Sequence, residues 1–127
     1  MTDISPTEPT ERPERMFVAH TTVDGIRVVT LRGDIDHDVK DALATALLPP
    51  DGADDGRAPR VVADLSGVTF LDSTGINVFV HVHHQVSAAQ GWLRLAAARE
   101  SVTRVVELVG LDTVIACHPT VEQALNP

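Results

Sequence analysis

The chain has 127 residues, 43% of them apolar and only 3% aromatic, and carries a formal charge of -8 at neutral pH. This length suits one domain with an aliphatic core and is short for two. The acidic balance gives no electrostatic footprint for nucleic acid or an anionic membrane, and the single cysteine, Cys117, excludes an internal disulfide and a multi-cysteine metal site.

The first 15 residues combine three prolines with Thr, Glu and Asp. Such a composition buries too little apolar surface to offset its own ordering entropy. We therefore expect a disordered tail over residues 1–15 and a single domain over residues 16–127. No run reaches the roughly 18 apolar residues of a bilayer span, and no leader pattern opens the chain, so we expect a soluble cytoplasmic protein.

Two short runs rich in Val, Thr and Ile, Met16–Thr22 and Ile26–Arg32, flank the pair Asp24-Gly25. Asp-Gly between such runs is a strong hairpin signal. We predict two antiparallel strands, the second ended by Gly33.

Asp36 is placed to cap a helix that runs to about Leu48, because apolar residues recur at helical spacing between them. Two prolines end this helix. The stretch that follows, residues 49–59, is rich in Gly, Asp and Pro and predicts a polar loop.

The second half alternates short apolar runs with helical patterns, which predicts parallel strands with helices packed on them. Together with the hairpin this gives an α/β fold with a small mixed sheet of about four to five strands. The expected elements are a strand at 61–65, a helix beginning at 73 and closed by Gly91, a strand at 92–97, a helix at 100–109 stopped by Gly110, a strand at 114–117 and a helical turn at 119–125.

The helix that begins near Ser73 has a polar face. At 100° per residue, Ser73, Asn77, His81 and His84 point away from the apolar side of the helix, which consists of Ile76, Phe79, Val82, Val86 and Ala89. Free N–H groups and the helix dipole favour negative charge at a helix N-terminus. Ser73 is therefore a candidate switch residue; the alternative is that its hydroxyl only caps the helix.

The sequence offers no catalytic centre. His81 and His84 are one turn apart, but no third ligand accompanies them, so we expect no metal and no cofactor. His83 points toward the apolar side, as expected of a core-edge histidine with one hydrogen bond. Leu71 stands where a Gly-x-Ser-x-Gly elbow would need glycine, and no phosphate-binding loop is present. We expect no enzymatic activity.

Three stretches together resemble one known family. They are Val61–Gly75, a buried strand followed by Val-Thr-Phe-Leu-Asp-Ser-Thr-Gly; Gly33–His37, read Gly-Asp-Ile-Asp-His; and Val102–Leu111. The chain resembles a STAS domain of the bacterial anti-sigma-factor antagonist type, from about Met16 to Leu125.

The resemblance implies a small sheet flanked by helices and a protein that binds a serine-kinase type of anti-sigma factor, so that a sigma factor is released. It implies that this kinase phosphorylates Ser73 and that a phosphatase restores it. Asp36 matches an aspartate that lies beside this serine in the family. The remaining residues of the implied binding surface are Asp72, Thr74 and Gly75.

One residue departs from the family pattern. Asn77 stands where the family usually has glycine, so a side chain meets the partner one turn beyond Ser73. This residue and the 49–59 loop bear on which anti-sigma factor fits. Two other functions stay open: a structural STAS scaffold in a multi-protein sensory complex, and a ligand-binding domain that uses the sheet edge. We expect a monomer or weak dimer.

Overall fold

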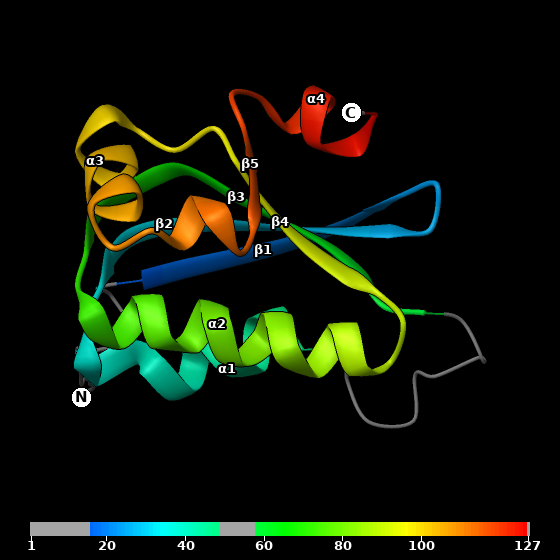
Figure 1. The fold of residues 1–127 in the computed structure, drawn as a ribbon, viewed down its shortest axis with the longest axis horizontal. Coiled ribbons are helices and arrows are strands. Elements are labelled where there is room, and N and C mark those ends of the chain that lie inside the picture. The colour runs from blue at the N-terminus through cyan, green and yellow to red at the C-terminus, as the bar shows by residue number, and fades with distance from the viewer. Residues whose placement is uncertain (1–15, 49–57, 127) are drawn as a thin grey trace, which may run out of the picture.

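The computed structural model describes residues 16–48 and 58–126 (Figure 1). The tail predicted over residues 1–15 and most of the predicted 49–59 loop lie outside these residues. The strands are β1 (Met16–Val23), β2 (Ile26–Ile35), β3 (Arg60–Leu71), β4 (Trp92–Ala96) and β5 (Ala116–His118). The helices are α1 (Lys40–Leu47), α2 (Ser73–Ala88), α3 (Glu100–Leu108) and α4 (Val121–Leu125), with short 3-10 helices η3 (His37–Val39) and η4 (Leu111–Thr113).

The five strands form one mixed sheet in the order β1-β2-β3-β4-β5. β1 and β2 are antiparallel, and every later pair is parallel. The hairpin turn is the predicted one: Asp24 and Gly25 have φ angles of 51° and 81°, and Val23 pairs with Ile26. The predicted α/β fold with a small mixed sheet is confirmed.

Helices cover the sheet unequally. α1, α2 and α3 bury their apolar residues in one large core against one face of the sheet, with Phe79, Leu43 and Val102 among them. α4 closes a second, smaller core around Val62 on the other face. Figure 1 shows α1 and α2 side by side below the strands and α4 above them. The large core therefore fixes the position of α2 against the strands.

The central strand is longer than the sequence predicted. β3 does not stop at Leu65 but runs on to Leu71, because its pairing with β2 continues through Arg32 opposite Gly67. Gly33 does not end β2 either. It takes a φ of 101°, and the register shifts between Gly33 and Asp34, so the glycine accommodates a bulge and the strand goes on.

The last strand is also displaced from its prediction. The sequence placed it at 114–117, whereas β5 spans Ala116–His118. The difference arises because η4 occupies the residues just after Gly110, and Val114 is the C-cap of that short helix. Gly110 itself has a φ of 77° and ends α3 as predicted.

Candidate functional site

The candidate site lies where two neighbouring parallel strands end. Ile35 of β2 pairs with Leu71 of β3, and the Asp72 amide donates a hydrogen bond of 3.2 Å to the Ile35 carbonyl. The chain therefore leaves both strands at the same edge of the sheet. Asp36 and Ser73, which the resemblance placed side by side, follow these strand ends directly.

Both aspartates at this edge cap helices. Asp36 Oδ1 accepts a hydrogen bond of 3.0 Å from the Asp38 amide at the start of η3. Asp72 Oδ1 accepts one of 3.1 Å from the Gly75 amide at the start of α2. Both side chains are half-buried. Each carboxylate satisfies an amide that the helix itself leaves without a partner, which fixes where the two helices begin.

Ser73 is the first residue of α2, and its side chain is exposed. The cap of α2 is Asp72, so the alternative that Ser73 serves only as a helix cap is wrong. Within residues 16–48 and 58–126 the Ser73 hydroxyl has no hydrogen-bond partner. The hydroxyl is thus exposed to solvent, and no hydrogen bond within the described residues holds it in place.

Gly75 has a packing role at this edge. It is buried, and a Cβ built on it would lie 2.5 Å from Leu71 Cδ1 and 2.7 Å from Ile35 Cγ2. Only a residue without a side chain lets the first turn of α2 rest this closely on the strand ends. Gly75 therefore helps to position Ser73 by letting the first turn of α2 pack on the strand ends, and Gly75 itself is buried and not part of the exposed surface.

A groove runs beside the serine, between α1 with η3 on one side and α2 on the other. Its volume is about 490 Å³. Thr74 and Asn77 line it, so two of the predicted binding residues face the same hollow. The full lining is His37, Lys40, Asp41, Ala44, Thr74, Asn77, Val78 and His81. The groove thus mixes polar and apolar side chains and carries charges of both signs.

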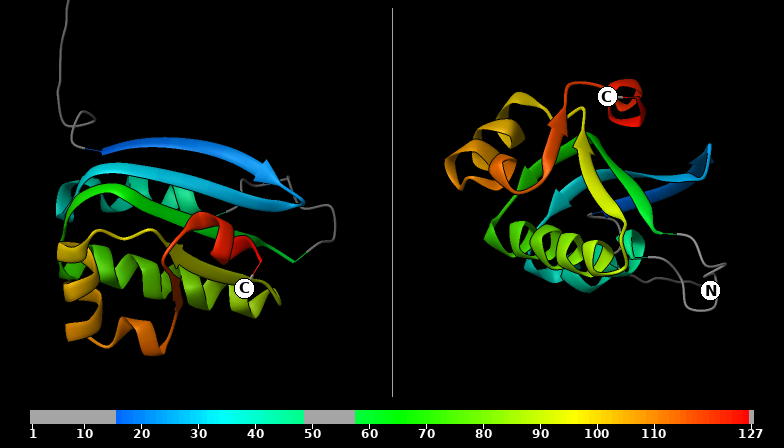
Figure 2. Two further views of the ribbon diagram at one scale, coloured as in Figure 1. Left: turned by 90° about the horizontal axis from the view of Figure 1, so that it is seen from above. Right: turned by 45° about the vertical axis from the view of Figure 1, so that its right-hand side comes forward.

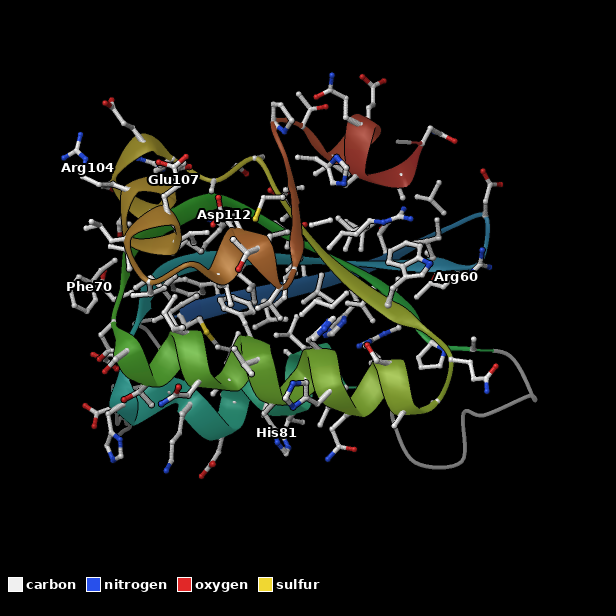
Figure 3. All side chains as sticks on the ribbon, in the orientation of Figure 1. Arg60, Phe70, His81, Arg104, Glu107 and Asp112 are labelled. Atoms are coloured by element: carbon white, nitrogen blue, oxygen red, sulfur yellow. The ribbon has the colours of Figure 1, made fainter. Side chains whose placement is uncertain are left out.

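The outward face of α2 was predicted correctly from helical periodicity. Asn77, His81 and His84 are exposed, whereas Phe79 and Val82 are fully buried. Figure 3 shows His81 pointing away from the sheet. One residue was wrong: Ala89 was expected on the buried side, but it is the C-cap of α2 and is exposed. The face that Ser73 shares is therefore available to a partner.

Sequence reasoning missed Phe70 and the charged residues that α1 contributes to the groove. Phe70 leaves 50% of its surface exposed two residues before Asp72, at the end of the molecule where α2 begins (Figure 3). Lys40 and Asp41 reach the groove from α1. An aromatic residue on a strand next to the serine motif, and charges one turn beyond the Asp36 cap, were the signals available for them.

The histidines form no metal site in the described part of the chain, where no three His, Cys, Asp or Glu residues come together. His81 Nε2 lies 3.3 Å from Gln85 Nε2. His83 is half-buried as predicted, but its Nδ1 is buried without a hydrogen-bond partner among the described residues, so the predicted hydrogen bond is not formed at that nitrogen.

Cys117 is exposed, but its thiol holds its proton more strongly than a free cysteine does. Burial raises the pKa of its thiol to about 11, and the carboxylates of Asp112 and Glu107 add to this rise because they disfavour a neighbouring thiolate. Both carboxylates come from the side of the molecule formed by α3 and η4 (Figure 3). The thiol is therefore protonated at neutral pH.

A mixed five-stranded sheet with an exposed serine at the start of its central helix defines a small α/β domain of the STAS type. The STAS domain profile matches residues 18–124, and the chain belongs to this family. No helix in the described residues combines the length and the apolar character needed to cross a bilayer.

Two similar curated proteins carry the name anti-sigma factor antagonist. One is from Thermotoga neapolitana, 30% identical over 67 residues, and the other from Thermotoga maritima, 31% identical over the same length. Each match covers 53% of this chain and 59% of the relative, so the chain spans about three fifths of the curated relatives that it matches.

A crystal structure of an anti-sigma factor antagonist from Mycobacterium paratuberculosis is 29% identical to this chain, with a TM-score of 0.74, over 91% of this chain and 96% of that one. The antagonist SpoIIAA in its unphosphorylated form shares the fold at 20% identity, with a TM-score of 0.65 over 87% and 94%. A sulfate transporter family protein from Wolinella succinogenes also shares the fold, at 15% sequence identity and a TM-score of 0.69. The match covers 83% of this chain and 85% of that one. The fold therefore serves more than one kind of protein, and function has to be argued from the site.

Proposed function

We propose that this protein is an anti-sigma-factor antagonist that binds a serine-kinase type of anti-sigma factor when unphosphorylated and is switched off by phosphorylation of Ser73. The names of its relatives support the general role. The observation that supports the switch is that Ser73 is exposed and that its hydroxyl makes no hydrogen bond within the described residues, while Asp72 caps the helix. A kinase can modify this hydroxyl without dismantling the fold.

The binding surface in this proposal is centred on the edge where β2 and β3 end. Asp36 and Asp72 present partly exposed carboxylates there, and Thr74 and Asn77 line the adjoining groove. Phe70 gives the surface an exposed aromatic ring, a kind of side chain that is enriched at protein interfaces. A partner that seats a side chain in the groove brings its own surface over Ser73.

The charge added by phosphorylation is large enough to release such a partner. A phosphoserine carries about -1.5 to -2 charges at neutral pH. Two charges about 6 Å from one partner carboxylate repel it by roughly 5 kcal/mol at an effective dielectric constant near 20. A thousandfold loss of affinity needs only about 4 kcal/mol. Where the partner places a carboxylate this close to Ser73, the added charge therefore suffices, with no change in the shape of the domain.

The domain itself tolerates the phosphate. A negative group at a helix N-terminus gains about 0.3–1 kcal/mol from the helix dipole, which offsets part of its repulsion by Asp72. The switch is therefore reversible: a phosphatase removes the group and restores binding. The protein acts by binding alone, with no catalytic residue, cofactor or contact to nucleic acid of its own, in the cytoplasm where ATP and sigma factors are present.

Phosphorylation assays test this function. The protein is incubated with ATP and candidate anti-sigma kinases, and mass spectrometry locates the phosphate. We expect it on Ser73, and we expect Ser73→Ala to bind the kinase while never being labelled. Ser87→Ala is the matched control, since it removes an exposed hydroxyl near the other end of α2 and should still be phosphorylated on Ser73.

Two results contradict the proposal. One is phosphate on a residue other than Ser73 in the protein that has lost binding. The other is recovery of large multi-protein particles that contain no kinase, because this favours a structural scaffold in which Ser73 has no regulatory role.

A further inference from the structure

One edge of the sheet is long and exposed. β1 pairs only with β2 in the described part of the chain and forms the outermost ribbon in the left view of Figure 2. It has eight residues, and all after Met16 are exposed. The opposite edge, β5, has only three residues. β1 is thus the edge at which the sheet can be extended.

This edge lacks the usual protection against pairing. Natural edge strands are commonly blunted by charged residues, by proline or by bulges. The sequence of β1, Met-Phe-Val-Ala-His-Thr-Thr-Val, has no Lys, Arg, Asp, Glu or Pro, and its pairing with β2 continues residue by residue without a shift of register. Nothing in the strand itself disfavours a further strand.

The hairpin fixes which backbone groups face outward. The two-residue turn has positive φ at Asp24 and Gly25, the pattern of a type I′ turn. The pair Val23 and Ile26 that closes such a turn exchanges both hydrogen bonds, and hydrogen-bonded pairs alternate along an antiparallel ladder. The amides of Val18, His20 and Thr22 therefore point away from β2.

We propose that a second copy of this chain pairs antiparallel with β1, joining two five-stranded sheets into one. An antiparallel pair of identical strands is related by a two-fold axis, so each copy offers the other the same alternating row of donors and acceptors. Phe17, Val18 and Val23, with 52%, 37% and 37% of their surfaces exposed, supply apolar cross-strand contacts.

Charge favours a second copy at this edge over other parts of the surface. Each chain carries a formal charge of -8, so most of its surface repels another copy. β1 has no charged side chain, and Arg32 of β2 lies over the Phe17 ring, 5.7 Å from its centroid. Pairing here places no two carboxylates opposite each other.

The dimer is weak and reversible. Eight residues at about 3.4 Å each give a contact about 27 Å long. With a sheet about 10 Å thick, the contact buries roughly 270 Å² on each copy. The area buried on both copies together, about 540 Å², is well below the roughly 1,200 Å² of stable interfaces. Since the two copies repel through their net charge, raising the salt concentration strengthens the association.

The test is sedimentation equilibrium of the full chain over a wide concentration range, combined with amide exchange. We expect dimerisation that strengthens at least several-fold between about 0.05 M and 0.5 M salt, where the Debye length falls toward a few ångström. We also expect concentration-dependent protection of the amides of Val18, His20 and Thr22.

Two variants separate pairing from folding. Val18→Pro removes an outward amide, which an edge strand tolerates, and abolishes the dimer; Val18→Thr keeps the amide and the dimer. Thr22→Lys adds a charge at the edge and abolishes the dimer by a route that does not depend on proline. Ser73→Asp leaves the dimer unchanged, so this proposal can fail while the phosphorylation switch stands.

A monomer at all concentrations overturns the proposal. So does protection of the outward amides that does not depend on concentration, because it means that a segment of the same chain covers β1. A dimer that persists in both Val18→Pro and Thr22→Lys places the contact elsewhere and also overturns it.

Discussion

Asp72→Ala tests the division of labour between the cap and the switch. The variant removes the 3.1 Å hydrogen bond that Asp72 Oδ1 accepts from the Gly75 amide. Loss of such a cap lowers the free energy of unfolding by about 1 kcal/mol. Loss of a negative charge at the helix N-terminus lowers it by a further amount of about 0.3–1 kcal/mol. We therefore expect the free energy of unfolding to fall by about 1–2 kcal/mol.

The assay is urea unfolding followed by circular dichroism. With a slope of about 2 kcal/mol per molar urea, the expected loss lowers the midpoint by about 0.5–1 M. Asp72→Asn keeps an acceptor oxygen and loses only the charge, so it should cost about 0.3–1 kcal/mol. Ser73→Ala should change the free energy by less than about 0.5 kcal/mol, as surface substitutions without special contacts do.

The reverse order would refute this reasoning. If Ser73→Ala destabilised the protein by about 1 kcal/mol while Asp72→Ala had no effect, the serine hydroxyl would be the cap. The hydroxyl would then be engaged in holding α2, and its modification would loosen the helix instead of only blocking a partner.

Three further predictions concern the same fold. Gly75→Ala forces a methyl group against Ile35 and should destabilise the protein by about 1–3 kcal/mol, seen as a lower melting temperature; a higher one would contradict the packing. Cys117 alkylation should accelerate continuously as pH rises toward the thiol pKa of about 11, and Asp112→Asn, which lowers that pKa, should speed it at fixed pH; an unchanged rate would show that this carboxylate does not act on the thiol. Ser73→Asp should shift the melting temperature by only a few degrees, since dipole and Asp72 oppose each other; unfolding would mean that the switch acts through stability.

The sequence predicted the elements that periodicity and turn chemistry determine. The Asp24-Gly25 hairpin and the outward face of α2 could be read from residue order because each depends on neighbours within a few positions. β3 could not. Ser66-Gly67 has the local character of a turn, yet pairing with β2 carries the strand to Leu71. That pairing joins residues more than 30 positions apart and leaves no local signal.

The sequence indicated which residues belong to the site, but it did not indicate the structural role of each one. Residue order alone left two roles open for Ser73, switch residue or helix cap. Only the folded geometry, in which Asp72 Oδ1 accepts a hydrogen bond from the Gly75 amide, assigns the cap to Asp72. Gly75 was predicted to frame the binding surface, whereas its closeness to Leu71 gives it a packing role. The groove depends on how α1 packs on α2, which no local pattern specifies.

The central proposal is tested most directly by titrating the cognate anti-sigma kinase with wild-type protein, Ser73→Asp and Ser73→Asn in a calorimeter. Asparagine matches aspartate in size and lacks its charge. We expect Ser73→Asn to bind within about tenfold of wild type and Ser73→Asp to bind far more weakly, a difference of a few kcal/mol. Equal affinity of wild type and Ser73→Asp would contradict control by charge at this hydroxyl.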